Sequence, residues 1–165
     1  MNVAYIDNQN LFMATSCHET SPWNVDMRKL RVYLRDKFKI EMASLYMGVF
    51  EEEYRRLYQA FRDMGYTVVF REHARIQRGK KKTNVDADIV FEMMLDAYAS
   101  QLIEKAVLIS GDGDYKKVVS HLIDVGKFEK LLLPSRINAS SLYKQVPEKF
   151  KLYLDDPDIK RKISR

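Results

Sequence analysis

Two aspartates separated by one glycine follow an apolar run in the segment VLISGDGDYKKVV, which begins at Val107. Asp112 and Asp114 lie at the end of a predicted buried strand, where like charges repel each other unless a cation is nearby. Carboxylate oxygens are the ligands that hard divalent cations such as Mg²⁺ and Mn²⁺ prefer. Gly111 and Gly113 would let the backbone bend so that both carboxylates reach the same side. The pattern indicates a candidate metal site, with a neighbouring lysine or no cation at all as the alternatives.

A third aspartate follows the first predicted strand. The run Asn2–Ile6 favours β structure, and Asp7 comes directly after it. The carboxyl ends of parallel strands meet at one edge of a sheet, which is where ligands bind in α/β folds. Asp7 is therefore expected to converge with Asp112 and Asp114. Asn10, three residues beyond Asp7, offers a neutral amide for a water or a phosphate oxygen.

Acidic residues also open the segment VDADIVFEMMLDAYAS, which is predicted as a helix. Asp88, Glu92 and Asp96 form one stripe at spacings of four residues, which is typical of a solvent-exposed helix face. Asp86 lies roughly 160° away from Asp88, on the apolar flank of the helix. Asp86 therefore either caps the helix or projects into the site at the edge of the sheet.

Strand-like and helix-like segments alternate along the chain, and the strands are continuous apolar runs. This order predicts an α/β fold of three layers, α/β/α, with a mainly parallel sheet of about five strands. Predicted strands cover residues 2–6, 42–50, 66–72, 105–110 and 130–134, and predicted helices cover residues 24–38, 51–65, 85–100, 114–126, 138–146 and 148–154. A chain of 165 residues fits a single domain over residues 1–165.

Positive charge is concentrated in one segment. The chain has a net charge of +5, and residues 71–82, REHARIQRGKKK, contain six basic residues and one acidic residue. Such a basic cluster indicates a phosphate-binding patch, and the alternative is a solvated loop. The candidate phosphate-binding residues are Arg71, Arg75, Arg78, Lys80, Lys81 and Lys82.

Neither an export signal nor a membrane span is apparent in the sequence. No apolar run approaches the roughly 20 residues that a membrane span needs, and the N-terminal segment lacks the basic region and cleavage site of a signal peptide. The single cysteine, Cys17, excludes an internal disulfide framework. We therefore expect a soluble cytoplasmic protein without a membrane partner, and its oligomeric state stays open, a homo-oligomer included.

Three segments, in this order and across nearly the whole chain, resemble the NYN domain family, a branch of the PIN-like nuclease superfamily. They are YIDNQNL, KKTNVDADIVFEMM and LISGDGDYKKVV, and SLYKQVPEKFKLYL is similar to the closing helices of the family. The resemblance implies a PIN-like fold with an acidic site that binds Mg²⁺ or Mn²⁺. The catalytic residues that it implies are Asp7, Asp86, Asp112 and Asp114, which also bind the metal, and Asn10 as an assisting polar residue. The family often has aspartate at the position of Glu92, which we therefore expect behind the ligands or on the surface.

The activity that this resemblance implies is that of a metal-dependent ribonuclease. The metal would make a bound water more acidic, so that it attacks a phosphodiester bond. The expected partner is RNA, in single-stranded form, whose flanking phosphates would contact the basic segment 71–82. Tyr115 and Phe12 lie beside the motifs and are candidates for stacking on bases, and packing in the core is the alternative for both.

Two other functions are compatible with the same residues. A non-catalytic RNA-binding or partner-binding PIN-like domain would keep the acidic cluster without cleaving RNA. Another phosphate-handling hydrolase would form an aspartyl-phosphate on Asp7, but the segment DNQN lacks the second aspartate that such enzymes usually carry two residues on. A divalent-ion titration tests the first alternative, and trapping with beryllofluoride tests the second.

Overall fold

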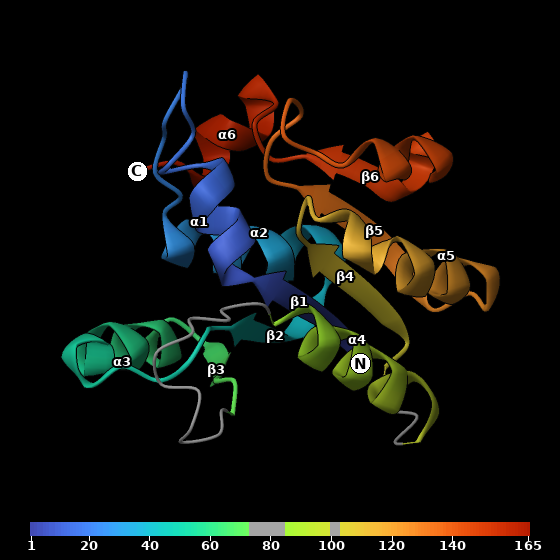
Figure 1. Cartoon of the computed structure of the whole chain (residues 1–165), viewed down its shortest axis with the longest axis horizontal. Coiled ribbons are helices and arrows are strands. Elements are labelled where there is room, and N and C mark those ends of the chain that lie inside the picture. The colour runs from blue at the N-terminus through green and yellow to red at the C-terminus, as the bar shows by residue number, and fades with distance from the viewer. Residues whose placement is uncertain (73–84, 100–102) are drawn as a thin grey trace.

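A six-stranded sheet forms the centre of this computed structural model, which describes residues 1–72, 85–99 and 103–165. The strand order is β3-β2-β1-β4-β5-β6, and every neighbouring pair is parallel (Figure 1). The strands are β1 (Asn2–Asp7), β2 (Ile40–Tyr46), β3 (Tyr66–Val69), β4 (Lys105–Ile109), β5 (Phe128–Leu133) and β6 (Lys151–Tyr153). The prediction of an α/β fold with a mainly parallel sheet is confirmed, with one strand more than expected.

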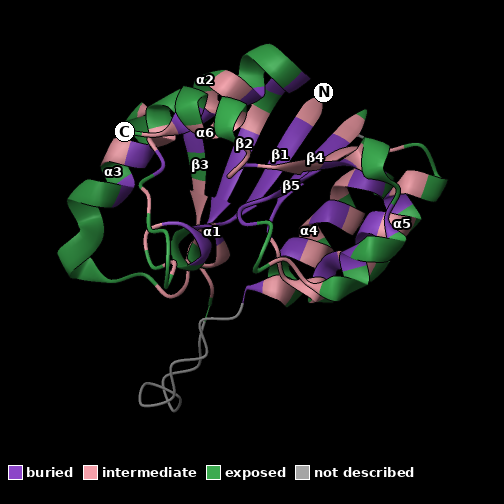
Figure 2. Ribbon diagram, turned by 90° about the horizontal axis from the view of Figure 1, so that it is seen from above, coloured by how far each residue is buried: buried purple, intermediate pink, exposed green. Residues whose placement is uncertain are grey.

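Helices cover both faces of the sheet, as a parallel sheet requires. One face carries α1 (Asn8–Ala14), α2 (Met27–Phe38), α3 (Arg55–Asp63) and α6 (Pro157–Ile163), and the other carries α4 (Asp86–Tyr98) and α5 (Lys116–Asp124). Figure 2 shows these two layers on either side of the buried central strands. Side chains along β1 alternate between the layers: Val3 and Tyr5 pack with α4 and α5, and Ala4 and Ile6 pack on the opposite face. This strand, buried on both faces, carries Asp7 at its carboxyl end.

The boundaries of α2 follow from its capping residues. Asp26 precedes the helix, and its Oδ1 accepts a hydrogen bond from the backbone amide of Lys29 at 3.0 Å. The helix ends at Lys39, which has a left-handed backbone conformation with φ of 57°. Leu30 and Leu34 are fully buried beneath it, whereas Arg35 and Lys37 lie on the exposed side of the helix.

Several predicted elements differ from the structure at their ends. The strand predicted over 42–50 occupies Ile40–Tyr46 instead. The helices predicted over 51–65 and 114–126 each begin with a 3₁₀ turn, η1 (Glu52–Tyr54) before α3 and η3 (Gly113–Tyr115) before α5. Local sequence patterns define the apolar faces of these elements, whereas caps and turns define their ends.

The C-terminal segment differs more. Residues 138–154, predicted as helices, form two 3₁₀ turns, η4 (Ser141–Gln145) and η5 (Glu148–Phe150), and then β6. Strand β6 is stabilised by pairing with β5, where Leu131 lies opposite Lys151, and this long-range pairing leaves no local pattern. Helices α1 and α6 were not predicted, and each has seven residues. No helix in the described ranges is long and apolar enough to cross a membrane.

Candidate active site

Asp7 is the last residue of β1 and lies beside the end of β4. Ile6 pairs with Ile109, so Asp7 reaches the level of Ser110. Asp7 Oδ1 caps α1 by accepting a hydrogen bond from the backbone amide of Asn10 at 3.1 Å. Asp7 Oδ2 accepts one from Ser110 Oγ at 3.4 Å. The residue is only 4% exposed, and this burial raises the pKa of Asp7 even though the hydrogen bonds oppose the shift.

The turn after β4 places Asp112 and Asp114 at the same edge of the sheet. The backbone amide of Asp112 donates to Ser110 Oγ at 3.1 Å, and Asp112 Oδ1 accepts from the backbone amide of Asp114 at 2.9 Å. The Tyr143 hydroxyl donates to the backbone carbonyl of Asp112. Asp112 therefore caps the 3₁₀ turn η3 with one carboxylate oxygen, and its second oxygen is the one left for a ligand.

The two glycines of this turn serve a different purpose from the one predicted. The glycines with positive φ in the described residues are Gly65 and Gly126, so Gly111 and Gly113 do not use the left-handed region. A Cβ atom on Gly113 would lie 2.4 Å from Ser140 Oγ, whereas one on Gly111 would meet its neighbours at 3.6 Å. Gly113 is required because the segment carrying Ser140 packs directly against the turn.

Asp86 projects into the site and does not act as the N-cap of α4. The N-cap position is Val85, without a side-chain capping bond, and Asp86 is the first helical residue. Asp86 Oδ1 accepts a hydrogen bond from the Tyr115 hydroxyl at 2.7 Å. Burial and then the charge of Asp112 raise the pKa of Asp86 to about 6 from its usual 3.8, although the Tyr115 hydrogen bond opposes the shift.

The structure brings the four predicted aspartates together. Carboxylate oxygens of Asp86, Asp112 and Asp114 all lie within 4.8 Å of one another. Asp7 joins this cluster through Tyr115, whose hydroxyl lies 3.1 Å from Asp7 Oδ2 as well as 2.7 Å from Asp86. A phenol has one proton to donate, so it satisfies only one of the two carboxylates at a time. When the proton points to Asp86, Asp7 still accepts hydrogen bonds from Asn10 and Ser110.

A cavity of about 310 Å³ opens beside the cluster. Its lining residues are Asp7, Gln9, Asn10, Met13, Val85, Asp86 and Asp112. The side-chain oxygen of Asn10 accepts a hydrogen bond from the backbone amide of Gly111 at 2.8 Å and so connects α1 to the turn after β4. This bond leaves the amide nitrogen of Asn10 as its donor toward a ligand.

The acidic stripe of α4 points elsewhere. Asp88 is exposed as predicted, but Asp96 is not simply a surface residue, because its Oδ2 accepts a hydrogen bond from the buried Tyr5 hydroxyl at 2.6 Å. Burial, followed by the charges of Glu92 and Asp96, raises the pKa of Tyr46. Glu92 therefore lies toward Tyr46, and it is not among the described acidic residues whose oxygens converge, which are Asp86, Asp112 and Asp114.

The structure describes one residue of the predicted basic patch. Arg71 is half-buried, and its backbone amide donates to the carbonyl of Gly48 at 3.1 Å. The other predicted members, Arg75, Arg78, Lys80, Lys81 and Lys82, lie outside the described residues. Of the two aromatic candidates, Tyr115 is fully buried and Phe12 is 53% exposed, so packing in the core applies to Tyr115 alone.

Two residues of the site, Ser110 and Tyr143, were not predicted from the sequence, and Tyr115 was predicted to stack on bases or pack in the core, not to bind the aspartates. Ser110 Oγ donates a hydrogen bond to Asp7 and accepts one from the backbone amide of Asp112. The Tyr115 hydroxyl contacts the carboxylates of Asp7 and Asp86. The Tyr143 hydroxyl donates to the backbone carbonyl of Asp112. The sequence signal for Tyr115 is its position directly after Asp114, where a buried phenol must satisfy its hydroxyl on nearby acceptors. Tyr143 carries no such signal, because it lies 31 residues from Asp112.

The sheet order and the acidic edge define an α/β fold of the PIN-like type. The crystal structure of a protein of unknown function, VPA0982 from Vibrio parahaemolyticus, is similar over 99% of this chain and 95% of that chain, with a TM-score of 0.71 and 18% sequence identity. A likeness at this identity supports the fold alone. No curated protein matches the chain.

The NYN domain model matches residues 3–152. The chain therefore belongs to the NYN domain family, which is a PIN-like nuclease family.

Proposed function

We propose that this protein is a metal-dependent ribonuclease that hydrolyses phosphodiester bonds of single-stranded RNA. The observation that carries the proposal is the approach of Asp86, Asp112 and Asp114 to within 4.8 Å of one another, with Asp7 linked to them through Tyr115. These carboxylates come from β1, α4 and the turn after β4 in a chain of a nuclease family. Such a cluster has little structural purpose without a positive partner, because its charges repel.

The donor set suits a hard divalent cation. The converging side-chain atoms are all carboxylate oxygens, which Mg²⁺ and Mn²⁺ prefer over nitrogen or sulfur. Asp86, Asp112 and Asp114 would hold the ion, and a bound cation would offset the raised pKa of Asp86, which burial and the charge of Asp112 cause. When bound, the cation would offset the clustered negative charge and make both water and the phosphodiester more reactive.

The surrounding residues have distinct tasks in this proposal. Asp7 is oriented by hydrogen bonds from Asn10, Ser110 and Tyr115. Asn10 would donate its amide nitrogen to a phosphate oxygen. Since no histidine lines this cavity among the described residues, a carboxylate of the cluster is expected to take the proton from the attacking water. The basic segment 71–82 stays a proposed contact for flanking phosphates.

A cleavage assay with matched variants tests this function. Labelled single-stranded RNA is incubated with the wild-type protein, Asp112→Asn and Asp124→Asn, each with Mn²⁺, Mg²⁺ or EDTA. Asparagine keeps the cap of the turn but removes a charge from the cluster. Asp124 is exposed at the end of α5 and controls for a charge lost elsewhere.

We expect metal-dependent cleavage by the wild-type and Asp124→Asn proteins, and a loss of about 100-fold or more in Asp112→Asn. A wild-type protein that binds RNA but leaves it intact with both metals would contradict the proposal and favour a non-catalytic RNA-binding domain. Equal cleavage by all three proteins would exclude the aspartate cluster as the catalytic site.

A further inference from the structure

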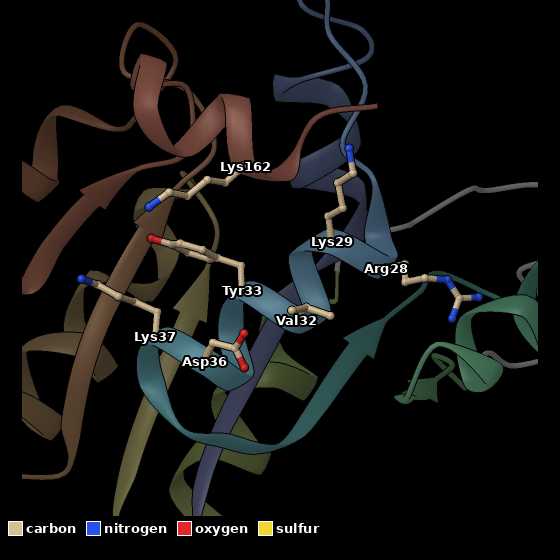
Figure 3. Close-up of a pocket in the computed structure, with 7 residues that line it drawn as sticks. All are labelled: Arg28, Lys29, Val32, Tyr33, Asp36, Lys37 and Lys162. Atoms are coloured by element: carbon tan, nitrogen blue, oxygen red, sulfur yellow. The ribbon is translucent and has the colours of Figure 1, made fainter.

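A groove of about 570 Å³ runs along the outer surface of α2 and is bordered by α6. Its lining residues, drawn in Figure 3, are Arg28, Lys29, Val32, Tyr33, Asp36, Lys37 and Lys162. It lies on the face of the sheet opposite α4 and α5, so it is separate from the helix that carries Asp86. Leu30, Leu34 and Phe38 of α2 are buried in the core, so the groove is formed by the opposite, outer side of this helix.

The charge of the groove is strongly positive. Four of its seven lining residues are basic and one is acidic, and the acidic residue, Asp36, is paired with Arg35 at 2.8 Å. Helix α2 contains five basic residues and one acidic residue, and α6 contains three and one. The two helices together therefore carry more positive charge than the net +5 of the whole chain, and they form a second basic region besides residues 71–82.

Three of the four basic residues that line the groove are uncommitted within the described residues. Lys29 Nζ donates to the carbonyl of Ser164 at 2.9 Å, whereas no hydrogen bond or ion pair to a described residue engages the side chains of Arg28, Lys37 and Lys162. In Figure 3 the ammonium groups of Lys37 and Lys162 extend to the same side of α2 as the Tyr33 hydroxyl. Charge left unpaired on a folded surface is available to an anionic partner.

The groove also contains apolar side chains. Tyr33 is half-buried and packs edge-to-face on Phe38, with ring centroids 6.0 Å apart and an interplanar angle of 83°. Val32 beside it is 40% exposed. An aromatic ring and an aliphatic side chain between cationic groups can contact nucleobases while the cations hold phosphates, which is the usual combination for binding single strands.

The spacing of the cations selects the kind of anion. Lys29 and Lys37, both of which line the groove, are separated by about 12 Å along the helix axis at a rise of 1.5 Å per residue. This separation exceeds the size of one small anion, so the cations suit a polyanion that carries several phosphates, such as a nucleic-acid strand. We propose that the groove between α2 and α6 binds the sugar–phosphate backbone of RNA, as a contact surface apart from the acidic cluster. This inference rests on the proposed function, since it takes the same RNA as ligand.

The test is the salt dependence of RNA binding in EDTA, where metal-dependent cleavage is absent. Fluorescence anisotropy with a labelled single-stranded RNA is measured for the wild-type protein and for Lys37→Gln/Lys162→Gln. The matched control, Arg56→Gln/Arg62→Gln, removes two exposed charges from α3. Each lost phosphate contact lowers the log–log slope by about 0.7 for a single strand, so we expect a fall of about 1.4 for the groove variant and none for the control.

Two results of this measurement would overturn the inference: an unchanged slope in the groove variant, or an equal fall in the control. A parallel assay measures binding to anionic phosphatidylserine vesicles, and a groove variant that lost vesicle binding but retained RNA binding would also overturn it. The last result would assign the groove to membranes. A wild-type protein that cleaves no RNA, together with the expected fall in slope, would refute the proposed hydrolysis and leave the groove assignment standing. Metal-dependent cleavage with an unchanged slope would do the reverse.

Discussion

The hydroxyl of Tyr115 lies 2.7 Å from Oδ1 of Asp86 and joins the start of α4 to the turn after β4. Because the same hydroxyl lies 3.1 Å from Asp7, it is the shared contact of two carboxylates, one from β1 and one from α4. Its ring is fully buried, so its position is fixed by the core. The hydrophobic core thereby positions the acidic cluster.

Replacing Tyr115 by phenylalanine removes this hydroxyl while keeping the packing of the ring. We expect the free energy of unfolding to fall by about 1–3 kcal/mol, because a buried hydrogen bond to a charged group is lost. We also expect Mn²⁺ affinity to fall by about 10- to 100-fold, as for other residues that orient metal ligands. Urea unfolding and calorimetric Mn²⁺ titration measure the two effects.

Tyr5→Phe is the matched control for this variant. Tyr5 is equally buried, and its hydroxyl donates to Asp96 at 2.6 Å, away from the cluster. It should lose a similar amount of stability and keep its Mn²⁺ affinity. If both variants lost Mn²⁺ affinity equally, Tyr115 would act only through general stability.

Titration of Asp86 should contribute to the pH dependence of the free energy of unfolding. Its pKa is raised to about 6 in the folded protein from the usual 3.8, so the folded state binds the proton more tightly than the unfolded state. The resulting stabilisation is complete below the unfolded pKa and is lost as the pH rises through about 6. Metal-free wild-type protein should therefore lose melting temperature relative to Asp86→Asn between about pH 4 and pH 7.

Thermal melts of both proteins in EDTA measure this difference. Subtracting the curve of Asp86→Asn removes contributions from other acidic groups, such as the exposed pairs of Asp36 with Arg35 and of Glu52 with Arg55. A flat difference curve, or one that rises with pH, would show that burial and the neighbouring carboxylates do not raise the pKa of Asp86 in the folded protein.

The close packing of the turn against η4 predicts opposite outcomes for its two glycines. Gly113→Ala would place a methyl group 2.4 Å from Ser140 Oγ, and we expect a loss of about 1–3 kcal/mol from overpacking. Gly111→Ala meets its neighbours at 3.6 Å and should be close to neutral. Adding Ser140→Gly to Gly113→Ala should restore only part of the stability, because Ser140 Oγ also accepts a hydrogen bond from the Leu142 amide. Similar losses at both glycines would contradict this explanation.

Much of the fold and the placement of the aspartates could be predicted from local patterns. Apolar runs that end at Asp7 and at Ser110 locate two strand ends, and parallel strands bring those ends together. The helical phase of Asp86 separates it from the stripe of Asp88, and the structure agrees with that separation. These inferences needed only periodicity and strand direction.

The remaining features depend on contacts between distant parts of the chain. The pairing that forms β6, the bond from Tyr143 to Asp112 and the fit of Gly113 under Ser140 all join segments that no local pattern relates. Asp96 was misplaced for the same reason, since its partner, Tyr5, lies 91 residues away. Sequence periodicity shows which face a residue occupies, but it does not show what that face contacts.

The most direct test of the central claim is an anomalous-difference map from a crystal soaked in Mn²⁺. We expect a peak among the carboxylates of Asp86, Asp112 and Asp114, at about 2.0–2.6 Å from their oxygens, which is the range for hard cations. A control crystal is soaked in Ca²⁺ and measured at the same wavelengths. A peak that shows the wavelength dependence of manganese, and is absent from the control, identifies bound Mn²⁺. A map with Mn²⁺ bound elsewhere and no peak among these three aspartates would contradict the metal site and the hydrolytic function proposed from it.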